Sequence, residues 1–595
     1  MRIDYKKNQL ERVLIGINAG TSALVVASFV LLFGFNKPLL PAWILFTVQV
    51  ILLCIFVIEK ICRLFNSASK IQFLRANWFE IPLLLFLFIT VIGANRWIAG
   101  MEISASEVRH FTVGIYLVLQ VVIKLCRTSI GLAASGKNPT KTLIASFLVL
   151  IISGAGLLML PAAARNENIS FIDALFTSTS ATCVTGLIVK DTGEDFSLMG
   201  QVVILTLIQL GGLGIVVFGA VLALLLGQAF SVRESVAMQD LLSTRTLSRI
   251  GNMIAFIFVG TIFIEAVGAV SLYSMWDDVP GLSGAHNHWF CSIFHSISSF
   301  CNAGFSLFNS SFTQYNRSWQ VYAVVCPLII LGGLGFGVLY DLVNIGADRI
   351  RRLLKKSFSK YYRFSMEAPK RMQLQTKIVL SVSAILIILG TIAILFFEHF
   401  TSKNISNENI GILGAFFQSV TARTAGFNTV DIDALTPSSK FILISLMFIG
   451  GSPGSTAGGI KTVTLAVVLM TAIAALRKRS EVEMFKRSVR IVVVGRAVTV
   501  TLLFVAVLFT ATLALSVTEV TNDFTMSDIM FEAGSALGTV GLTTGITPVL
   551  TTAGKLIIIA TMLIGRLGPL TLLAALTFNL KPARYNYPDE AIIVG

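Results

Sequence analysis

Uninterrupted apolar runs, each about as long as a bilayer is thick, recur along almost the whole chain and decide the solvent in which it folds. The first four runs cover residues 13–35, 41–59, 79–99 and 110–126. A helix needs about 20 apolar residues to cross the hydrocarbon core. Only 13% of the 595 residues are charged, which is too few to cover a sizeable soluble domain. The sequence therefore predicts an all-α, polytopic membrane protein.

Basic residues gather in the connections between alternate apolar runs. This distribution of a net charge of +15 is typical of cytoplasmic loops, and it predicts that both termini lie in the cytoplasm. It also explains the charge without a nucleic-acid partner. The first run is too long for a cleavable signal. The clusters lie at residues 2–12, 60–75, 127–141, 349–377, 477–490 and 581–584.

Titratable and metal-binding side chains form no pattern that indicates an enzyme. The seven cysteines are scattered without a CxxC pair, and His286 and His288 lack further ligands for a metal ion. The apolar runs hold no cluster of nucleophiles, acids or metal ligands, and the first four lack the regularly spaced arginines of a voltage sensor. Residues 1–130 are therefore expected to form an accessory region of four transmembrane helices.

A short segment rich in Ser, Thr, Phe and Gly occurs four times after about residue 142. In each copy a Phe stands ten residues before a Gly, and Leu or Phe follows that Gly. The glycines are separated by 118, 122 and 115 residues, so the period is nearly constant. The copies are FTSTSATCVTGL with Gly186, FHSISSFCNAGF with Gly304, FFQSVTARTAGF with Gly426 and FEAGSALGTVGL with Gly541.

A second motif follows each copy in a matching position. It reads LGGLG at 210–214 and 331–335, IGGSPG at 449–454 and IGRLG at 564–568. Two motifs in phase predict four pseudo-symmetric repeats of helix, pore loop and helix around a central pore. With the four N-terminal helices, about 12 spans are expected. The predicted repeats cover 142–228, 250–346, 375–476 and 490–580, followed by a cytoplasmic tail at 581–595.

The segment between two spans is too short to cross the bilayer, so it must enter and return. Non-helical backbone at that depth is tolerated where it lines a water-filled path. Four such segments would point carbonyls at one axis, and carbonyl rings replace the hydration shell of a cation. Glycine permits the close approach, and the preceding short helix directs its partially negative C-terminus at the ion. The repeats therefore predict a cation-conducting pore.

Acidic residues follow the first and third segments. On the outer side of the membrane they would raise the local concentration of cations. Ordinary solvated loop charge explains them equally well, so both interpretations stay open. The residues are Asp191, Glu194, Asp195, Asp431 and Asp433.

The second span of the third repeat is broken by Gly450, Gly451, Pro453, Gly454, Gly458 and Gly459. Glycine and proline clusters interrupt helices, so residues 450–459 are expected to form a polar loop inside the membrane. Arg566 stands at the position that Gly212, Gly333 and Gly451 hold in the other repeats. An arginine at mid-membrane costs about 2.5 to 3.5 kcal/mol on insertion scales without a cavity or a partner. Arg566 is expected to tether the loop, to form a positive barrier below the pore loops, or both.

The four segments resemble the selectivity filters of the Trk/Ktr/HKT superfamily of potassium transporters. The resemblance covers about residues 142–595 and includes GGSPGSTAGGIKT at 450–462 and IGRLGPLT at 564–571, which are similar to Ktr and Trk membrane subunits. Four N-terminal spans are more than such a subunit is expected to carry. The implied filter carbonyls belong to Val184, Thr185, Gly186, Asn302, Ala303, Gly304, Thr424, Ala425, Gly426, Thr539, Val540 and Gly541. The implied intramembrane gate consists of Gly450, Gly451, Ser452, Pro453, Gly454, Ser455, Thr456, Gly458, Gly459 and Arg566.

The resemblance also implies potassium uptake through a channel-like pore, with K⁺ as the substrate at the filter carbonyls and no cofactor on this chain. In the superfamily, Ser at the first filter glycine accompanies sodium preference, so Gly186 favours potassium. Sodium or mixed monovalent cation transport is the alternative.

The implied assembly is a homodimer in the bacterial inner membrane with a cytosolic nucleotide-binding regulatory subunit. The basic loops 349–377 and 477–490 are expected to face that partner or anionic lipids. This chain has no P-loop, so a response to nucleotide would come from the partner.

Overall fold

The structure is a computed structural model, and it describes most of the chain after residue 139. Apart from isolated positions, the expected spans 79–99 and 110–126 and the tail 581–595 lie outside the described residues. The described residues are 6, 8–35, 39–76, 84–85, 88, 112–114, 116–117, 120, 139–165, 168–214, 250–276, 285–358, 370–401, 410–479 and 481–569.

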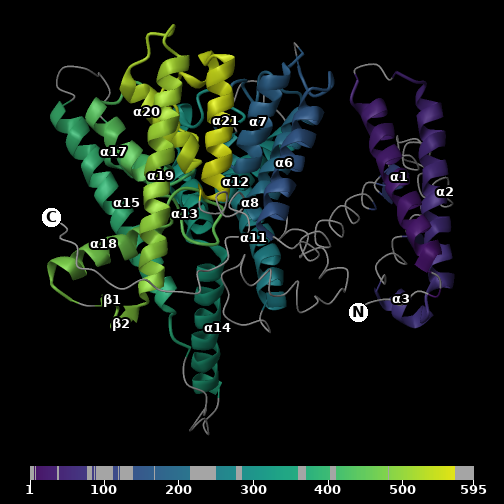
Figure 1. Ribbon diagram of the computed structural model, residues 1–595, viewed down its shortest axis with the longest axis horizontal. Coiled ribbons are helices and arrows are strands. Elements are labelled where there is room, and N and C mark those ends of the chain that lie inside the picture. Colours follow the sequence, from purple (N-terminus) through teal and green to yellow (C-terminus); the bar gives the residue numbers. More distant parts are fainter. Residues whose placement is uncertain are drawn as a thin grey trace, which may run out of the picture.

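Two long apolar helices form a hairpin that stands beside the main bundle (Figure 1). They are α1 (Asn8–Phe33) and α2 (Ala42–Asn66), and the short helix α3 (Lys70–Ala76) follows them. Both coincide with expected spans, although α2 continues well past residue 59. The additional turns carry Arg63, which pairs with Glu59 one turn earlier and with Glu11 of α1 at 3.6 Å. This pairing neutralises charge at one end of the hairpin.

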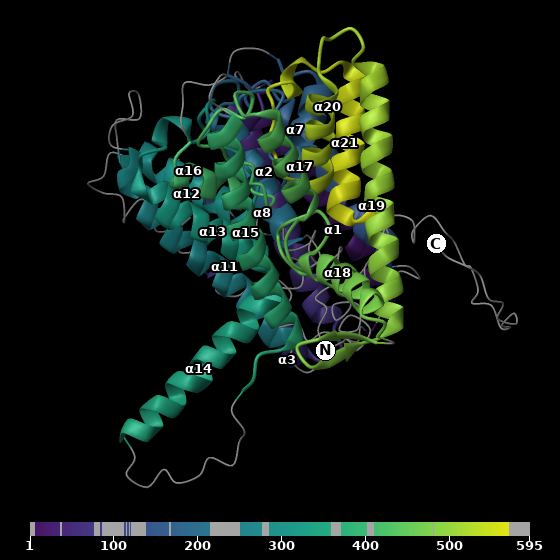
Figure 2. The ribbon, with the colours of Figure 1, turned by 90° about the vertical axis from the view of Figure 1, so that its left-hand side faces the viewer.

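After residue 139 one order of elements occurs four times: a long helix, a short helix, a loop and a second helix (Figures 1 and 2). The long helices are α6 (Pro139–Leu158), α11 (Ile250–Leu272), α15 (Leu374–Thr401) and α19 (Ile491–Thr518). The short helices are α7 (Phe171–Cys183), α12 (Ala285–Cys301), α16 (Ile412–Thr421) and α20 (Met526–Gly538). The second helices are α8 (Leu198–Leu213), α13 (Cys326–Leu334), α17 (Pro437–Phe448) and α21 (Thr552–Leu567).

Two helices continue from second helices, α14 (Phe336–Phe358) after α13 and α18 (Thr462–Leu476) after α17. The described residues depart from the all-helical expectation at one small antiparallel hairpin, β1 (Val482–Met484) and β2 (Arg487–Val489), with Val482 opposite Val489. Its two turn residues both have positive φ, as a two-residue hairpin turn of matching twist requires. Short helical turns lie at Tyr273–Trp276, Thr313–Tyr315, Val321–Val325 and Thr547–Val549.

Five helices within the described residues are long and apolar enough to cross a membrane, and a sixth is counted if α13 and α14 form one bent span. The chain is therefore a polytopic, helical membrane protein. The five are Gln9–Phe33, Trp43–Asn66, Gly251–Trp276, Leu374–Phe400 and Ile491–Thr518. The expectation of about 12 spans stays a prediction, because much of the N-terminal region is not described.

The second helix of each repeat packs against the short helix of the next repeat, so the repeats follow one another in a circle. α8 packs on α12, α13 on α16 and α17 on α20, and α21 returns to α7. Ion pairs strengthen two of these contacts. Lys440 of α17 lies 3.5 Å from Asp528 of α20, and Lys555 of α21 lies 2.7 Å from Asp173 of α7. Both aspartates stand in the first turn of a short helix, next to its Ser or Thr N-cap.

Serine and glycine fix the short helix against the long helix in the first three repeats. In each case a serine hydroxyl of the short helix donates to a carbonyl of the long helix. Three residues later the long helix has a glycine, at which an added Cβ would collide with that serine. Small residues permit this close approach of helices inside a membrane. The bonds join Ser178 to Ile151 O at 2.7 Å, Ser296 to Glu265 O at 2.7 Å and Ser419 to Ile387 O at 2.8 Å.

The second helices of the first, second and fourth repeats also end at a glycine, which the sequence reasoning did not anticipate. Gly214, Gly335 and Gly568 close the LGGLG and IGRLG motifs with φ of 80°, 86° and 82°. Such positive values favour glycine and end a helix. Beyond Gly335 the chain turns through 103°, and α14 projects away from the bundle (Figure 2).

Gly154→Ala is expected to lower the melting temperature of the purified protein. A Cβ there would meet the Ser178 hydroxyl and would lie 2.7 Å from Leu207 Cδ1, and overpacking of this kind costs about 1–3 kcal/mol. The matched control is Gly156→Ala in the same helix, where a Cβ meets nothing within 4 Å. Equal melting curves for the two variants in detergent would contradict the prediction.

Candidate functional site

The four Gly-containing segments share one unusual backbone conformation. Each glycine has positive φ, and so does the residue two positions before it. Left-handed backbone costs a non-glycine residue roughly 1–2 kcal/mol, so the surrounding structure must hold these residues in place. The φ values are 57° at Val184, 58° at Asn302, 74° at Thr424 and 50° at Thr539, and 93°, 70°, 81° and 95° at Gly186, Gly304, Gly426 and Gly541.

The four segments meet and close a ring. A Cβ placed on Gly186 would lie 2.5 Å from the carbonyl oxygen of Ala303, in the segment of the next repeat. The same relation holds at each step of the circle, so no side chain fits at any of the four glycines and backbone lines the ring. The remaining pairs are Gly304 with Ala425 O, Gly426 with Val540 O, and Gly541 with Thr185 O of the first repeat.

Hydroxyl groups of the short helices hold the segments in place. In the first and fourth repeats a serine accepts from the glycine N–H: Ser180 from Gly186 at 3.1 Å and Ser535 from Gly541 at 3.0 Å. In the second and third repeats a hydroxyl donates to the carbonyl that follows the glycine. These bonds run from Ser298 to Phe305 O and from Thr421 to Phe427 O, both at 2.7 Å.

The ring joins two sources of partial negative charge. Each short helix ends beside its segment, so helix C-termini and segment carbonyls meet around one axis. The site residues Val184 to Gly186, Asn302 to Gly304, Thr424 to Gly426 and Thr539 to Gly541 are almost entirely buried. Buried backbone oxygens without side chains between them suit a dehydrated cation.

The loop between α17 and α18 returns on itself. Its ends meet as a parallel bridge between Ile449 and Ile460, and Thr462 N donates to Gly451 O at 3.1 Å. Gly454 and Gly459 have φ of 70° and 65°, conformations that glycine allows. The structure thus brings the nine loop residues of the predicted gate together, and Arg566 contacts them at Thr456 O.

This loop lies against the segments and second helices of other repeats. In the second repeat, Ser452 N donates to Gly333 O at 3.0 Å and Gly454 O accepts from Phe336 N at 3.0 Å. In the fourth repeat, a Cβ on Gly458 would lie 3.0 Å from Thr539 Cγ2. The loop therefore sits directly beside the ring, on the side where the short helices end.

Arg566 connects the loop to the first repeat. Its Nη1 donates to Thr456 O of the loop, while Nη2 donates to Gly211 O and, at 3.4 Å, to Gly212 O. Within the described residues no carboxylate lies within ion-pair distance of this guanidinium. Arg566 is therefore both a tether of the loop and an unbalanced positive charge next to the ring.

Lys461 is a second cation of the loop that the sequence reasoning did not single out. Its ammonium donates to Ala457 O at 2.6 Å and to Gly458 O at 3.5 Å. A lysine directly after a glycine-rich break inside an apolar region is the signal that marks it.

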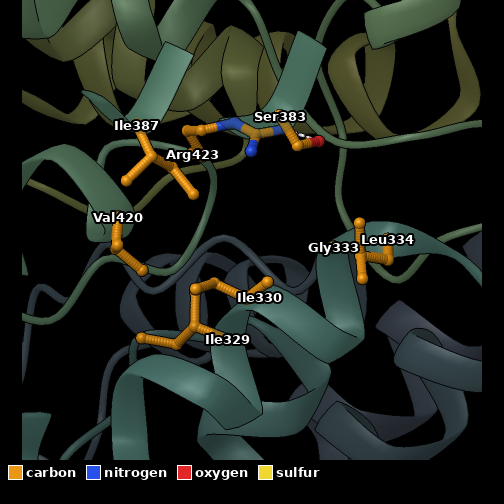
Figure 3. A pocket seen from close by; sticks show the side chains of 8 residues that line it. All are labelled: Ile329, Ile330, Gly333, Leu334, Ser383, Ile387, Val420 and Arg423. Atoms are coloured by element: carbon orange, nitrogen blue, oxygen red, sulfur yellow. Dashed lines mark hydrogen bonds between the residues drawn. The ribbon is translucent and has the colours of Figure 1, made fainter. Parts of the chain in front are cut away.

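Arg423, next to Thr424 of the third segment, was also missed. It is 8% exposed, its Nη2 donates to Ser383 Oγ at 3.2 Å, and its Nε has no hydrogen-bond partner. Figure 3 shows the guanidinium along one side of a small pocket, next to Ser383, with Ile329 and Ile330 on the opposite side. The charge lies beyond the C-terminal end of α16, where a cation is favourable. The other repeats have Cys183, Cys301 and Gly538 at this position.

A buried carboxyl lies behind the second segment. Glu265 of α11 is 7% exposed and accepts from Gln209 Nε2 of α8 at 3.2 Å. Cys301, next to Asn302, lies 3.5 Å from Gln209 Oε1. A Glu within the apolar run 250–272 was the available signal.

The acidic residues that follow the first and third segments are engaged in local structure. Asp191 Oδ1 accepts from the backbone N–H groups of Gly193 and Glu194, both at 2.8 Å, and Asp195 accepts from Asp191 N at 2.7 Å. Burial raises the pKa of Asp191, while these N–H bonds oppose the shift. Asp433 pairs with Lys440 at 2.9 Å. Asp191 and Asp195 thus stabilise a turn, a role beyond the two interpretations of attracting cations and of ordinary solvated loop charge.

Comparison with known proteins supports a transporter of this architecture. A family model described as TrkH, cation transport protein, matches residues 107–585. The potassium transporter TrkH from Vibrio parahaemolyticus, a crystal structure, superposes with a TM-score of 0.57 at 19% identity, covering 84% of this chain and 98% of that one. At this identity the likeness shows the fold.

Two relatives have a higher sequence identity to this chain than the TrkH crystal structure has. The potassium/sodium uptake protein NtpJ of Enterococcus hirae and the Ktr system potassium uptake protein B of Bacillus subtilis are each 37% identical to this chain. Each match covers 77% of this chain and 97% of the relative. The chain belongs to the TrkH family of cation transport proteins, a transporter family and not an enzyme family. The resemblance to Trk and Ktr membrane subunits is confirmed.

Replacing Arg566 by Gln is expected to speed amide hydrogen exchange in residues 450–459 by on the order of tenfold, because bonds from a charged donor to the loop and to Gly211 O are lost. Exchange mass spectrometry of the purified protein measures the change. Lys555→Gln, earlier in the same helix and engaged with Asp173 instead, is the control. A loop that exchanges equally in wild type and R566Q would contradict the tether.

Proposed function

We propose that this protein takes up potassium through a channel-like pore whose selectivity filter is the ring of four segments. The observation that carries the proposal is the closed succession of glycines and carbonyls: each of Gly186, Gly304, Gly426 and Gly541 faces a carbonyl of the next segment. A ring of backbone oxygens replaces hydration water without a moving side chain.

The choice of potassium rests on the ring glycines and on the relatives. All four ring positions are glycine, including Gly186, whose replacement by Ser the resemblance associates with sodium. One relative is named for potassium and another for potassium and sodium. Mixed potassium and sodium uptake is therefore the second candidate function.

The loop at 450–459 together with Arg566 is proposed as the gate. It lies beside the ring, and its contacts with Gly333 and Phe336 are single backbone bonds that a modest motion would break. Arg566 adds a positive charge on the route of the cation. Opening would require the Thr456 carbonyl to leave Arg566.

The proposed assembly is a homodimer in the bacterial inner membrane with both termini in the cytoplasm and a cytosolic nucleotide-binding regulatory subunit. Relatives named as parts of a Ktr system support a multi-component arrangement. The projecting helix α14 carries Arg349, Arg351 and Arg352 on the side where the basic loop 349–377 begins. Basic residues there suit an acidic protein surface or anionic lipid.

Gly186→Ser is expected to lower the potassium-to-sodium permeability ratio by about tenfold. A Cβ there lies 2.5 Å from Ala303 O, and relief of a strain of roughly 1–3 kcal/mol would deform the ring. Flux of potassium, rubidium and sodium into proteoliposomes measures the ratio. The control is Gly545→Ala, which has a similar φ of 92° but open space around its Cβ. A ratio that is unchanged in G186S, or equally reduced in G545A, would argue against the filter.

Arg566→Ala is expected to raise cation flux several-fold at equal expression, because both the barrier charge and the tether are removed. Growth rescue of a potassium-uptake-deficient strain at low potassium, with sodium as the comparison ion, gives a second readout. Arg566→Lys retains the charge but not the two-pronged donor. Flux that is unchanged or lower in R566A would refute the barrier role.

A further inference from the structure

One position of the short helices carries a titratable side chain in alternate repeats. Nine residues before the ring glycine, the second repeat has His295 and the fourth has Glu532, whereas the first and third have Thr177 and Phe417. His295, Phe417, Glu532 and Thr177 are all 0% exposed. A buried carboxyl and a buried imidazole need specific partners.

Glu532 reaches from its short helix to the chain that leaves the ring. Its Oε1 accepts from the hydroxyls of Thr543, two residues after Gly541, and Thr547, the latter at 3.0 Å. The two hydroxyls are also 3.0 Å apart. The nearest charged group along α20 is Asp528 in the preceding turn, which is occupied by Lys440. The carboxyl therefore serves as a strut between helix and outgoing segment.

His295 makes the equivalent connection with different chemistry. Its Nδ1 lies 2.8 Å from Cys291 O, a pure acceptor, so Nδ1 carries the proton. Its Nε2 then accepts from the hydroxyl of Ser306, two residues after Gly304, at 3.1 Å and from Leu307 N at 3.4 Å. Aromatic rings of Trp276, Phe308 and Phe312 pack around the imidazole.

Repeats one and three lack such a strut in the described structure. The residue two positions after the glycine is Ile188 in the first repeat and Asn428 in the third. The amide of Asn428 donates to Val430 O at 3.2 Å and does not reach back to its short helix. Because the repeats follow in the order one to four around the ring, the two struts stand on opposite sides of it.

We propose that His295 and Glu532 are positioning residues that set the ion selectivity of the ring by bracing its outgoing segments from two opposite sides. The proposal rests on the ring being the selectivity filter. A ring held at a fixed width favours one cation size, and an unbraced segment lets the carbonyls move inward towards a smaller dehydrated ion. Rigid support from outside the first layer of contacts is what such a site needs.

The experiment removes each strut at its hydroxyl and leaves the short helix intact. Thr543→Val and Ser306→Ala delete the hydroxyl bond that the residue two positions after the ring glycine makes to Glu532 and to His295, while the bonds from Thr547 and from Leu307 N stay. Each substitution is expected to lower the potassium-to-sodium permeability ratio in proteoliposomes about tenfold. The reason is the loss of one buried hydrogen bond, to the Glu532 carboxyl in T543V and to the His295 imidazole in S306A. The double variant is expected to lower this permeability ratio by more than the two single effects combined, because both segments border the same ring.

Two further variants separate positioning from simple damage. Thr543→Ser keeps the hydroxyl and is expected to retain the wild-type permeability ratio. Thr177→Val removes a fully buried hydroxyl at the position of His295 and Glu532 in a repeat without a strut, and it is expected to leave the ratio unchanged. Total potassium flux and melting temperature are measured in parallel.

The outcomes are distinct. T543V or S306A with a wild-type ratio overturns the proposal, and so does a ratio that falls equally in T177V. If G186S also leaves the ratio unchanged, the filter itself is wrong. If G186S alone lowers the ratio, the filter stands and only the struts are refuted.

Discussion

Backbone carbonyls that no helix satisfies are the constraint on which this structure depends. In the hydrocarbon core each unsatisfied group costs several kcal/mol, yet the four segments place such groups face to face around Gly186 and its three counterparts. The left-handed residues before the glycines, the hydroxyls of Ser180 and Ser535, and the packing of each second helix on the next short helix all serve to keep those groups aligned.

The departures from fourfold equivalence lie close to the ring. Where three repeats have glycine, the fourth has Arg566; where others have Cys or Gly, the third has Arg423. Arg423 and Glu265 are buried, and Glu265 stands in one of the apolar helices long enough to cross a membrane, where a charged side chain is costly without a partner or a cavity. The four segments thus share one backbone conformation, while the side chains next to them differ from repeat to repeat.

Sequence periodicity was sufficient to predict the four segments, their glycines and the broken third repeat, because each depends on local residue types at fixed spacing. It missed the helix ends at Gly214, Gly335 and Gly568, since LGGLG is as apolar as the helix before it. Arg423 and Glu265 depend on contacts between repeats, with Ser383 and Gln209, that no spacing within one segment reveals. The order of the repeats around the ring likewise comes only from packing.

The ring is drawn from one continuous chain, and this has a genetic consequence. In an assembly of four identical subunits a single codon change alters all four walls at once. Here a change at Gly304 alters one wall and leaves Gly186, Gly426 and Gly541 as they were. With the ring as the proposed selectivity filter, ion preference can therefore change by substitution of one segment at a time while the other three segments keep their glycines.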